Sequence, residues 1–167
     1  SLRRIAVVGD PSFRGFAGLA EHVLARAPGL GLAAQNLDFR LPEDPLEARI
    51  AAFAEGGGAG MIVLPTALNL LARGRLVAAI GARRLPAIYP FRPYVEAGGL
   101  MSYGPEPLDL FRRAAGHVDR ILRGENPGDL PVQLPTRFEF FINQGAARAI
   151  GRDFPDMLLA RADEVIE

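Results

Sequence analysis

Residues 84–105 decide the fold, and they read RLPAIYPFRPYVEAGGLMSYGP. The apolar run Ala87–Tyr89 predicts a short buried strand, and Pro90 ends it because proline cannot donate to a strand ladder. Phe91 and Arg92 then follow the carboxyl end of that strand. Open α/β sheets bind their ligands at this position, so the stretch predicts both a core strand and a ligand site.

A second apolar run follows in the same stretch after a pair of glycines. Gly98-Gly99 turns the chain into the run Leu100 to Tyr103, and Gly104-Pro105 ends it. Residues 84–105 therefore hold two short apolar runs, two turns and several aromatic and charged side chains that we expect to be exposed.

The first ninety residues alternate between two kinds of apolar pattern. Short apolar runs predict strands at Arg4–Asp10, Leu30–Phe39, Met61–Leu64 and Ala87–Tyr89. Helical spacing predicts three helices between them, along Phe16–Ala27, Leu46–Ala54 and a segment through Leu70, Leu71, Val77 and Ile80. This order predicts an α/β fold, a three-layer sandwich whose mostly parallel sheet is covered by helices on both faces.

Punctuation residues support the helix assignments. Asp44-Pro45-Leu46-Glu47 provides a capping acceptor, a proline in the first turn and a carboxylate at the third helical position. Three glycines, 56–58, end that helix, and Pro28-Gly29 ends the one before it. Thr66 is expected to cap the third helix.

The pattern changes after residue 104. Glu106-Pro107 opens a long helix whose apolar face is wide although no strand follows nearby. That face consists of Leu108, Phe111, Ala115, Val118 and Leu122, widened by Leu110, Ala114 and Ile121. A segment rich in proline and glycine, Asn126–Pro135, is typical of a linker. A final strand at Arg137–Asn143 and a short helix at Gln144–Ile150 are expected before the tail, which carries a small apolar run around Met157–Leu159.

Composition excludes several classes of function. The 19 basic residues are all arginine and balance 19 acidic ones, so nothing favours nucleic acid or an anionic membrane as a partner. The absence of cysteine excludes thiol catalysis, disulfides and thiolate zinc sites. No run approaches the roughly 20 apolar residues of a membrane span. Arg3-Arg4 leads directly into a strand, so any export signal is expected to lie outside this chain.

Cofactor and catalytic motifs are also missing from the sequence. The glycine-rich segment 56–60 follows a helix and precedes a strand, the reverse of a nucleotide-binding loop. Ser12 and Ser102 lack the GxSxG frame of a serine hydrolase. His22 and His117 lie on predicted helices, where solvated or partly packed histidines are typical. No carboxylate pair has the spacing of a glycosidase or metal site, so we expect no catalytic residue, no metal and no cofactor.

Loops after the predicted strands should meet at one edge of the sheet, because parallel strands all end there. They contribute Asp10, Ser12, Phe13 and Arg14, then Pro65, Thr66 and Ala67, then Phe91 and Arg92. Free N–H groups at the helix starts after Ser12 and Thr66 could hold a carboxylate, and Arg14 or Arg92 could pair with it. Phe13, Phe91 or Tyr103 could stack on an apolar ligand. The alternative is that these residues are ordinary helix caps and edge aromatics.

The motif LPAIYPF…VEAGGLMSYGP, with the helix after it, resembles the C-terminal half of ABC-transporter substrate-binding proteins of the type I periplasmic-binding fold. The likeness extends to Asp129–Gln133 and to the ending Leu158–Ile166. It implies a two-lobed clamshell that traps a small organic solute such as an amino acid, delivers it to ABC permease subunits and catalyses no reaction. It also implies a periplasmic or other extracytoplasmic location.

The resemblance also implies a division of the chain. Residues 1–99 would be the second ligand-binding lobe, 100–135 a hinge-crossing strand and helix that normally pack on a first lobe, and 136–167 the returning strand, short helix and tail. The first lobe is missing here, so we expect a cleft with one wall and a possible homodimer through the Leu108–Leu122 helix. The positions that match cleft-facing loops and hinge are Asp10, Ser12, Phe13, Arg14, Thr66, Ala67, Phe91, Arg92, Ser102 and Tyr103.

Two other functions stay open at this point. The same fold is reused as the ligand-sensing domain of larger receptors and regulators. A small enzyme of the flavodoxin-like type would instead show turnover or a tightly bound cofactor, and no motif in the sequence supports it.

Overall fold

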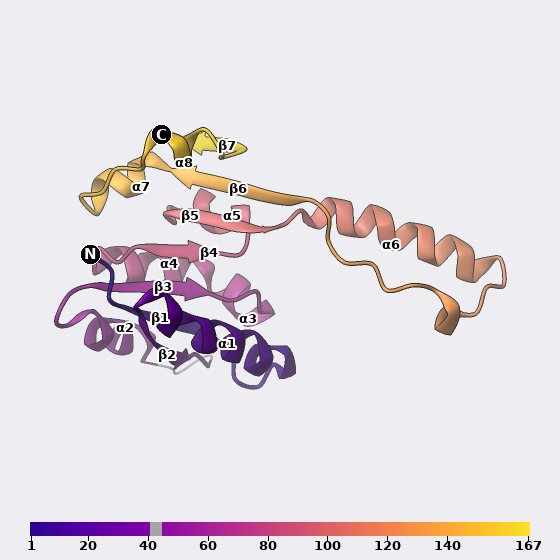
Figure 1. Ribbon diagram of the computed structural model, residues 1–167, viewed down its shortest axis with the longest axis horizontal. Coiled ribbons are helices and arrows are strands. Elements are labelled where there is room, and N and C mark those ends of the chain that lie inside the picture. Colours follow the sequence, from indigo (N-terminus) through magenta and orange to yellow (C-terminus); the bar gives the residue numbers. More distant parts are fainter. Residues whose placement is uncertain (41–44) are drawn as a thin grey trace.

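A computed structural model describes residues 1–40 and 45–167, which form one seven-stranded sheet in the order β2-β1-β3-β4-β5-β6-β7 (Figure 1). The strands are β1 (Arg4–Gly9), β2 (Ala33–Asp38), β3 (Ala59–Val63), β4 (Ala87–Tyr89), β5 (Met101–Pro105), β6 (Phe138–Asn143) and β7 (Glu164–Ile166). Strands β1 to β5 pair in parallel, and β5 and β6 pair antiparallel. The predicted α/β fold with a mostly parallel sheet is confirmed.

Helices lie on both faces of the sheet, giving three layers. They are α1 (Arg14–Arg26), α2 (Leu46–Ala54), α3 (Ala67–Leu71), α4 (Arg73–Ala82), α5 (Arg92–Glu96), α6 (Pro107–Leu122), α7 (Gln144–Ala149) and α8 (Asp156–Leu159), with single turns at Ala27–Leu30 and Pro127–Asp129. Each parallel crossover carries a helix, as the connection between parallel strands requires.

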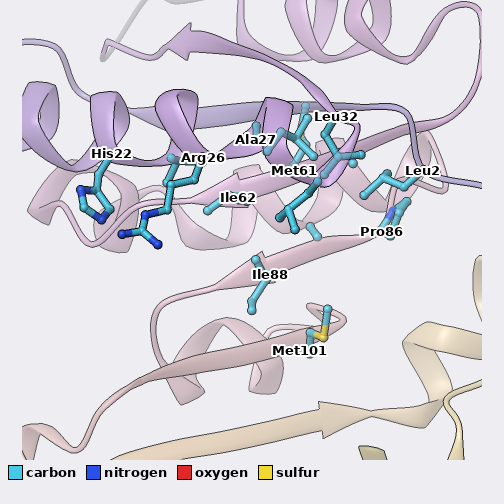
Figure 2. A pocket seen from close by; sticks show the side chains of 15 residues that line it. Leu2, His22, Arg26, Ala27, Leu32, Met61, Ile62, Pro86, Ile88 and Met101 are labelled. Atoms are coloured by element: carbon cyan, nitrogen blue, oxygen red, sulfur yellow. The ribbon is translucent and has the colours of Figure 1, made fainter.

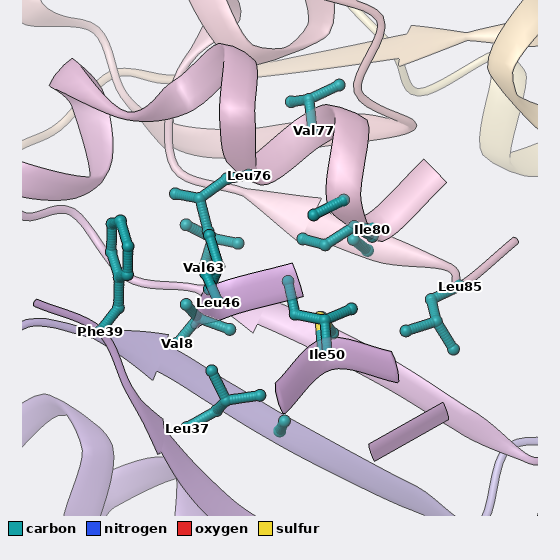
Figure 3. Packing of buried hydrophobic residues seen from close by; sticks show 14 of the residues in the cluster. Val8, Leu37, Phe39, Leu46, Ile50, Val63, Leu76, Val77, Ile80 and Leu85 are labelled. Atoms are coloured by element: carbon teal, nitrogen blue, oxygen red, sulfur yellow. The ribbon is translucent and has the colours of Figure 1, made fainter. Parts of the chain in front are cut away.

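The larger core lies between the sheet and the helices α2 and α4 (Figure 3). In this core, Val8 of β1 and Val63 of β3 lie in one buried cluster with residues of both helices. These are Ile50 of α2 and Leu76 and Ile80 of α4. A smaller cluster on the opposite face joins α1 to the sheet through Val7, Phe16, Ala20 and Leu64. The two faces are therefore covered unequally.

The helix predicted through Leu70, Leu71, Val77 and Ile80 is in fact two helices, α3 and α4, which meet at Ala72. Ala72 leaves helical geometry with φ −88° and ψ 9°, so the stripe does not continue across it. Leu71 is 78% exposed while Ile80 is buried, which makes the single-stripe prediction wrong. The proposed cap at Asp44 lies outside the described residues.

Short elements that were not predicted include α5, α8 and β7. Helix α5 fills the turn between β4 and β5, with Pro93 in its first turn. Strand β7 pairs with β6 in parallel and forms one edge of the sheet. The N–H of Phe140 donates to the carboxylate of Asp163 at 2.7 Å, which fastens the approach to that edge.

Helix α6 and the chain that returns from it project away from the sheet as an arm (Figure 1). We define the arm as residues 107–136. None of the residues of α6, all of which the structure describes, is buried. Arg113 donates to the side chain of Gln133 at 3.0 Å and to the carbonyl of Leu134 at 2.9 Å, so helix and returning chain move as a unit.

Candidate functional site

The loops that follow β1, β3 and β4 lie at one edge of the sheet. Val8 pairs with Val63 and Ile62 with Ile88 in parallel register, so the three strands end at neighbouring positions. We call this edge the carboxyl rim and define it by the loops 9–14, 64–67 and 90–92. Open α/β sheets bind ligands at this kind of edge.

The first loop of the carboxyl rim is shaped by Asp10. Its Oδ1 accepts hydrogen bonds from the N–H of Ser12 at 2.8 Å and from the hydroxyl of Ser12 at 2.6 Å. Phe13 precedes α1 and lies exposed above Gly15, where an added Cβ would come within 2.7 Å of the ring. The guanidinium of the exposed Arg14 shows no ion pair within the described residues, so it is available to an anion.

The second loop is held by two buried polar residues. The hydroxyl of Thr66 accepts from the N–H of Asn69 at 3.1 Å, which confirms Thr66 as the cap of α3. The amide of Asn69 donates to the carbonyl of Val8 at 3.1 Å and to that of Leu64 at 2.9 Å, tying the ends of β1 and β3 together. Ala67 is exposed beside them.

Sequence reasoning missed Asn69. It is fully buried, and its Oδ1 has no hydrogen-bond partner among the residues described. A signal was present: a polar amide three residues after a capping threonine, inside an otherwise apolar helix, is costly to bury unless it has partners.

The third loop brings Phe91 and Arg92 to the rim. Phe91 precedes α5 and packs against the edge of the larger core. Arg92 pairs with Glu96 at 2.7 Å and with Glu164 at 2.6 Å, and its guanidinium lies 4.9 Å from the ring centroid of Phe141. The hydrogen bonds that Arg92 donates to Glu96 and then to Glu164 raise the pKa of Arg92. Arg92 therefore links α5 to β7, whereas the guanidinium of Arg14 has no ion-pair partner among residues 1–40 and 45–167.

Ser102 and Tyr103 lie on opposite faces of β5, as neighbours in a strand do. Ser102 is buried, and its hydroxyl has no partner within the described part of the chain. It lines a cavity of about 40 Å³ together with Phe91, Arg92 and Phe141. Tyr103 is exposed, stacks on Phe138 at 5.6 Å and lies edge-on to Phe140.

Tyr103 belongs to an open hollow of about 210 Å³ at the carboxyl rim. The lining is mostly apolar and comes from the ends of three strands, with Leu64 and Pro65 after β3, Phe91 after β4 and Tyr103 in β5. Such a surface can accept a flat apolar group, while the first loop offers a hydroxyl and a guanidinium along the same edge.

The arm joins the sheet at a pair of charged residues. Glu106 is buried and pairs with Arg137 at 3.0 Å and with Arg112 at 3.8 Å. The N–H of Glu106 donates to the carbonyl of Arg137 at 3.1 Å, so the outgoing and returning chains are joined here. Two antiparallel strands and this ion pair set the direction in which the arm leaves the rim.

The described residues hold neither a cluster of metal ligands nor a membrane-spanning helix. Across residues 1–40 and 45–167, no group of three or more histidine, aspartate or glutamate side chains is placed to hold a metal ion. No helix in that part of the chain combines the length and apolarity that a membrane span needs.

Solved structures share this architecture. A conserved domain protein from Vibrio cholerae superposes with a TM-score of 0.89 at 25% identity over 99% of this chain and 55% of its own. A domain from Streptococcus pneumonia, solved in complex with L-Trp, gives 0.87 at 20% identity over 99% and 57%. The ligand-free, open form of a substrate binding protein with adhesive properties from Clostridium difficile gives 0.70 at 16% identity over 99% and 54%.

This chain thus spans little more than half the length of each of those proteins. Its fold corresponds to one lobe of a type I periplasmic-binding protein together with a crossover strand and helix. Comparison with curated proteins gives no significant match. Residues 1–166 match the family described as ABC transporter substrate binding protein, and the chain belongs to that family.

Proposed function

We propose that this chain is a solute-binding lobe of an ABC importer and that its carboxyl rim is one wall of the binding cleft. The observation that carries the proposal is the open apolar hollow at the rim, bordered by exposed Tyr103 and sharing an edge with Ser12 and Arg14. Family membership supports a solute as the ligand and permease subunits as partners. The role is binding and release without chemical change to the solute, in an extracytoplasmic location.

A small organic solute with a carboxylate and an apolar body suits this wall. Arg14 would pair with the carboxylate, and Ser12 could add a second hydrogen bond by turning its hydroxyl from Asp10 to the ligand. Phe13, Phe91 and Tyr103 would contact the apolar part. An amino acid has both features. The domain from Streptococcus pneumonia, whose fold this chain shares, is bound to L-Trp, which supports an amino acid as the class of ligand.

The division into lobes follows from the same proposal. Residues 1–99 and 136–167 form the lobe, and residues 100–135 provide the hinge-crossing strand and the helix that extends toward a second lobe. The buried Glu106–Arg137 pair lies where the crossing begins, which supports a hinge at this point.

The proposal is tested by recording amide chemical shifts of the labelled chain during titration with each of the twenty amino acids. We expect saturable shifts confined to loops 9–14, 64–67 and 90–92. Where a single rim binds the solute, the Kd should be on the order of 1 mM, because one wall supplies only part of the contacts of a closed cleft. Arg14→Gln should abolish saturation by the best ligand. Arg83→Gln, exposed at the end of α4 away from the carboxyl rim, is the matched control and should leave the titration unchanged.

Shifts that map away from the carboxyl rim, or an equal effect of the two arginine variants, would show that the rim is not the binding wall. Consumption of the solute during the titration would contradict a binding role without chemistry.

A further inference from the structure

An apolar groove of about 400 Å³ lies on the sheet face that α1 covers only in part (Figure 2). Its floor is a row of side chains that the parallel register places side by side, with Ile62, Ile88 and Met101 on β3, β4 and β5. Leu2 and Pro86 lie at the end of the groove nearest the starts of the strands. His22 and Arg26 point toward the groove from α1 (Figure 2).

The arm carries an exposed apolar ridge on α6, whose convex shape is complementary to the groove. Leu108, Phe111, Ala115, Val118 and Leu122 recur along one side of α6, and we call them the open stripe. Phe111 is 74% and Leu122 is 82% exposed, whereas the neighbouring side of the helix faces the returning chain across Leu110, His117 and Ile121. Exposed apolar surface of this extent marks an interaction site. One chain thus holds both a convex apolar ridge and a concave apolar groove.

The lengths of the two features agree. Helix α6 begins where β5 ends, at the carboxyl rim, and its 16 residues extend about 24 Å at 1.5 Å each. The six-residue strand β1 extends about 20 Å from its start to the same rim. If two copies met rim to rim, α6 of each would reach along the partner's sheet to its far edge.

Charge agrees with the same arrangement. Arg26 is the twelfth residue after Arg14, where α1 leaves the rim, and Asp119 is the twelfth after Pro107, where α6 leaves it. Arg26 and Asp119 therefore lie at similar distances from the carboxyl rim, so α6 of one copy placed along the groove of another would bring them close together. Asp119 flanks the open stripe beside Val118, and its ion-pair partner in the described part of the chain is Arg123, directly after α6, at 3.0 Å. Arg26 is the one formally charged residue among the described residues that line the groove.

We propose that two copies of this chain form a two-fold dimer in which α6 of each lies in the apolar groove of the other. The open stripe faces Ile62, Ile88 and Met101, Leu108 lies at the rim end, and Leu122 lies near Leu2. The exchange is closed, and each contact occurs twice, which doubles the buried area per dimer. The two rims then face each other as two walls of a cleft; this last point rests on the proposed function, whereas the assembly does not.

Engineered cysteines test the register directly, because the chain has none of its own. We expect most of the double variant Leu2→Cys/Leu122→Cys to become a disulfide-linked dimer under mild oxidation, because position 122 of one copy lies near position 2 of the other. Leu2→Cys/Leu108→Cys, at the wrong end of the helix, and Leu2→Cys/Arg120→Cys, on its polar side, should cross-link at least tenfold less. Equal cross-linking in the three pairs, or efficient cross-linking of Leu122→Cys alone, would overturn the proposal in favour of random or helix-to-helix contact.

Molar mass in solution provides an independent measurement. Val118→Asp places a charge in the open stripe and should convert the dimer to monomer without loss of fold, since Val118 is exposed. Gly116→Asp, whose added side chain would meet open space on the polar side of α6, is the matched control and should remain dimeric. Two results would refute the arrangement. One is a wild-type chain that stays monomeric at high concentration, which would mean that something other than a second copy fills the groove. The other is a dimer that persists in Val118→Asp. Neither result depends on whether a solute binds.

Discussion

Single buried polar residues fix the geometry of the carboxyl rim. Asn69 donates to carbonyls at the ends of two strands, and Thr66 satisfies the first turn of α3, so the first two loops of the rim are joined by side chains as well as by the sheet. At this scale the rim is rigid where it meets the sheet. Arg14 and Tyr103, which we propose face the ligand, are exposed.

Replacing Asn69 with alanine should therefore destabilise the whole fold. The carbonyls of Val8 and Leu64 would lose their donor and a cavity would form, so we expect a loss of about 2–4 kcal/mol in the free energy of unfolding. Denaturant titration measures it. Asn36→Ala, on the exposed side of β2, should change stability by less than about 0.5 kcal/mol. Similar values for the two variants would contradict a structural role for Asn69.

Gly104 allows β5 to pass close to the end of β4. A Cβ at this position would lie 2.0 Å from the carbonyl oxygen of Pro90, which is backbone and has little freedom to move. We expect Gly104→Ala to separate the two strands at the rim and to cost about 1–3 kcal/mol by denaturant unfolding. Gly18→Ala, on α1 with open space around the position, should be neutral or stabilise by up to about 1 kcal/mol. An unaffected Gly104→Ala variant would show that this approach is not tight in solution.

Contacts between elements explain which parts of the fold the sequence made predictable. Strand ends at Pro65 and Pro90 and the glycines after α2 are local signals, and the elements they bound appear close to the predicted positions. The buried position of Asn69 in α3 depends on carbonyls at two strand ends. Strand β7 depends on Asp163 and Glu164 meeting residues far away in the chain. Such tertiary causes leave no periodic pattern in a short segment.

The candidate site was predictable to the same degree. The order of strands and helices was enough to bring loops 9–14, 64–67 and 90–92 to one edge, because parallel topology dictates it. The partners of individual side chains were not, since Arg92 meets Glu164 across 72 residues of sequence. Asn69 was missed for the same reason: its acceptors lie on two different strands.

Helices α2 and α4 are joined by an ion pair whose strength depends on pH. Glu47 accepts from Arg75 at 2.6 Å, and this hydrogen bond is the main cause that lowers the pKa of Glu47 from 4.5 to about 2. A carboxyl group with a lowered pKa in the folded state stabilises the fold above its ordinary pKa, and that contribution is lost as pH falls toward the folded value. Most of the loss should occur between pH 4.5 and pH 2.

Comparison of wild type with Glu47→Gln isolates this contribution. The variant should be less stable than wild type at neutral pH, and the difference should shrink as the pH falls through that window. Denaturant unfolding at several pH values measures it, and an NMR titration of the Glu47 carboxyl gives the pKa directly. Glu55→Gln serves as the control in an exposed position. A stability difference that is constant across the window would mean that the pair does not form in solution.

The molecule as a whole has two parts that differ in burial. The body is the seven-stranded sheet with the helices that cover it, and the arm is residues 107–136. The body buries its apolar residues in two clusters on either side of the sheet, whereas α6 buries none of its residues, all of them described. A helix of this length is marginal alone in water and gains its stability from packing its apolar side. The arm therefore adds no buried side chain of α6 to the core of the body, which agrees with the proposal that α6 packs on a second copy.

Removing the arm should therefore leave the body folded. Joining Glu106 to Arg137 through Asn-Gly would convert β5 and β6, which already pair antiparallel from Met101–Ile142 to Pro105–Phe138, into a simple hairpin. We expect cooperative unfolding in calorimetry, with a Tm within roughly 8 °C of that of full-length Val118→Asp, the matched monomeric reference. The armless chain should also be monomeric, because it keeps the apolar groove and loses the helix that fills it. Broad, non-cooperative melting would show instead that the arm and the body form a single folding unit. The claim that the body folds without the arm would then be wrong.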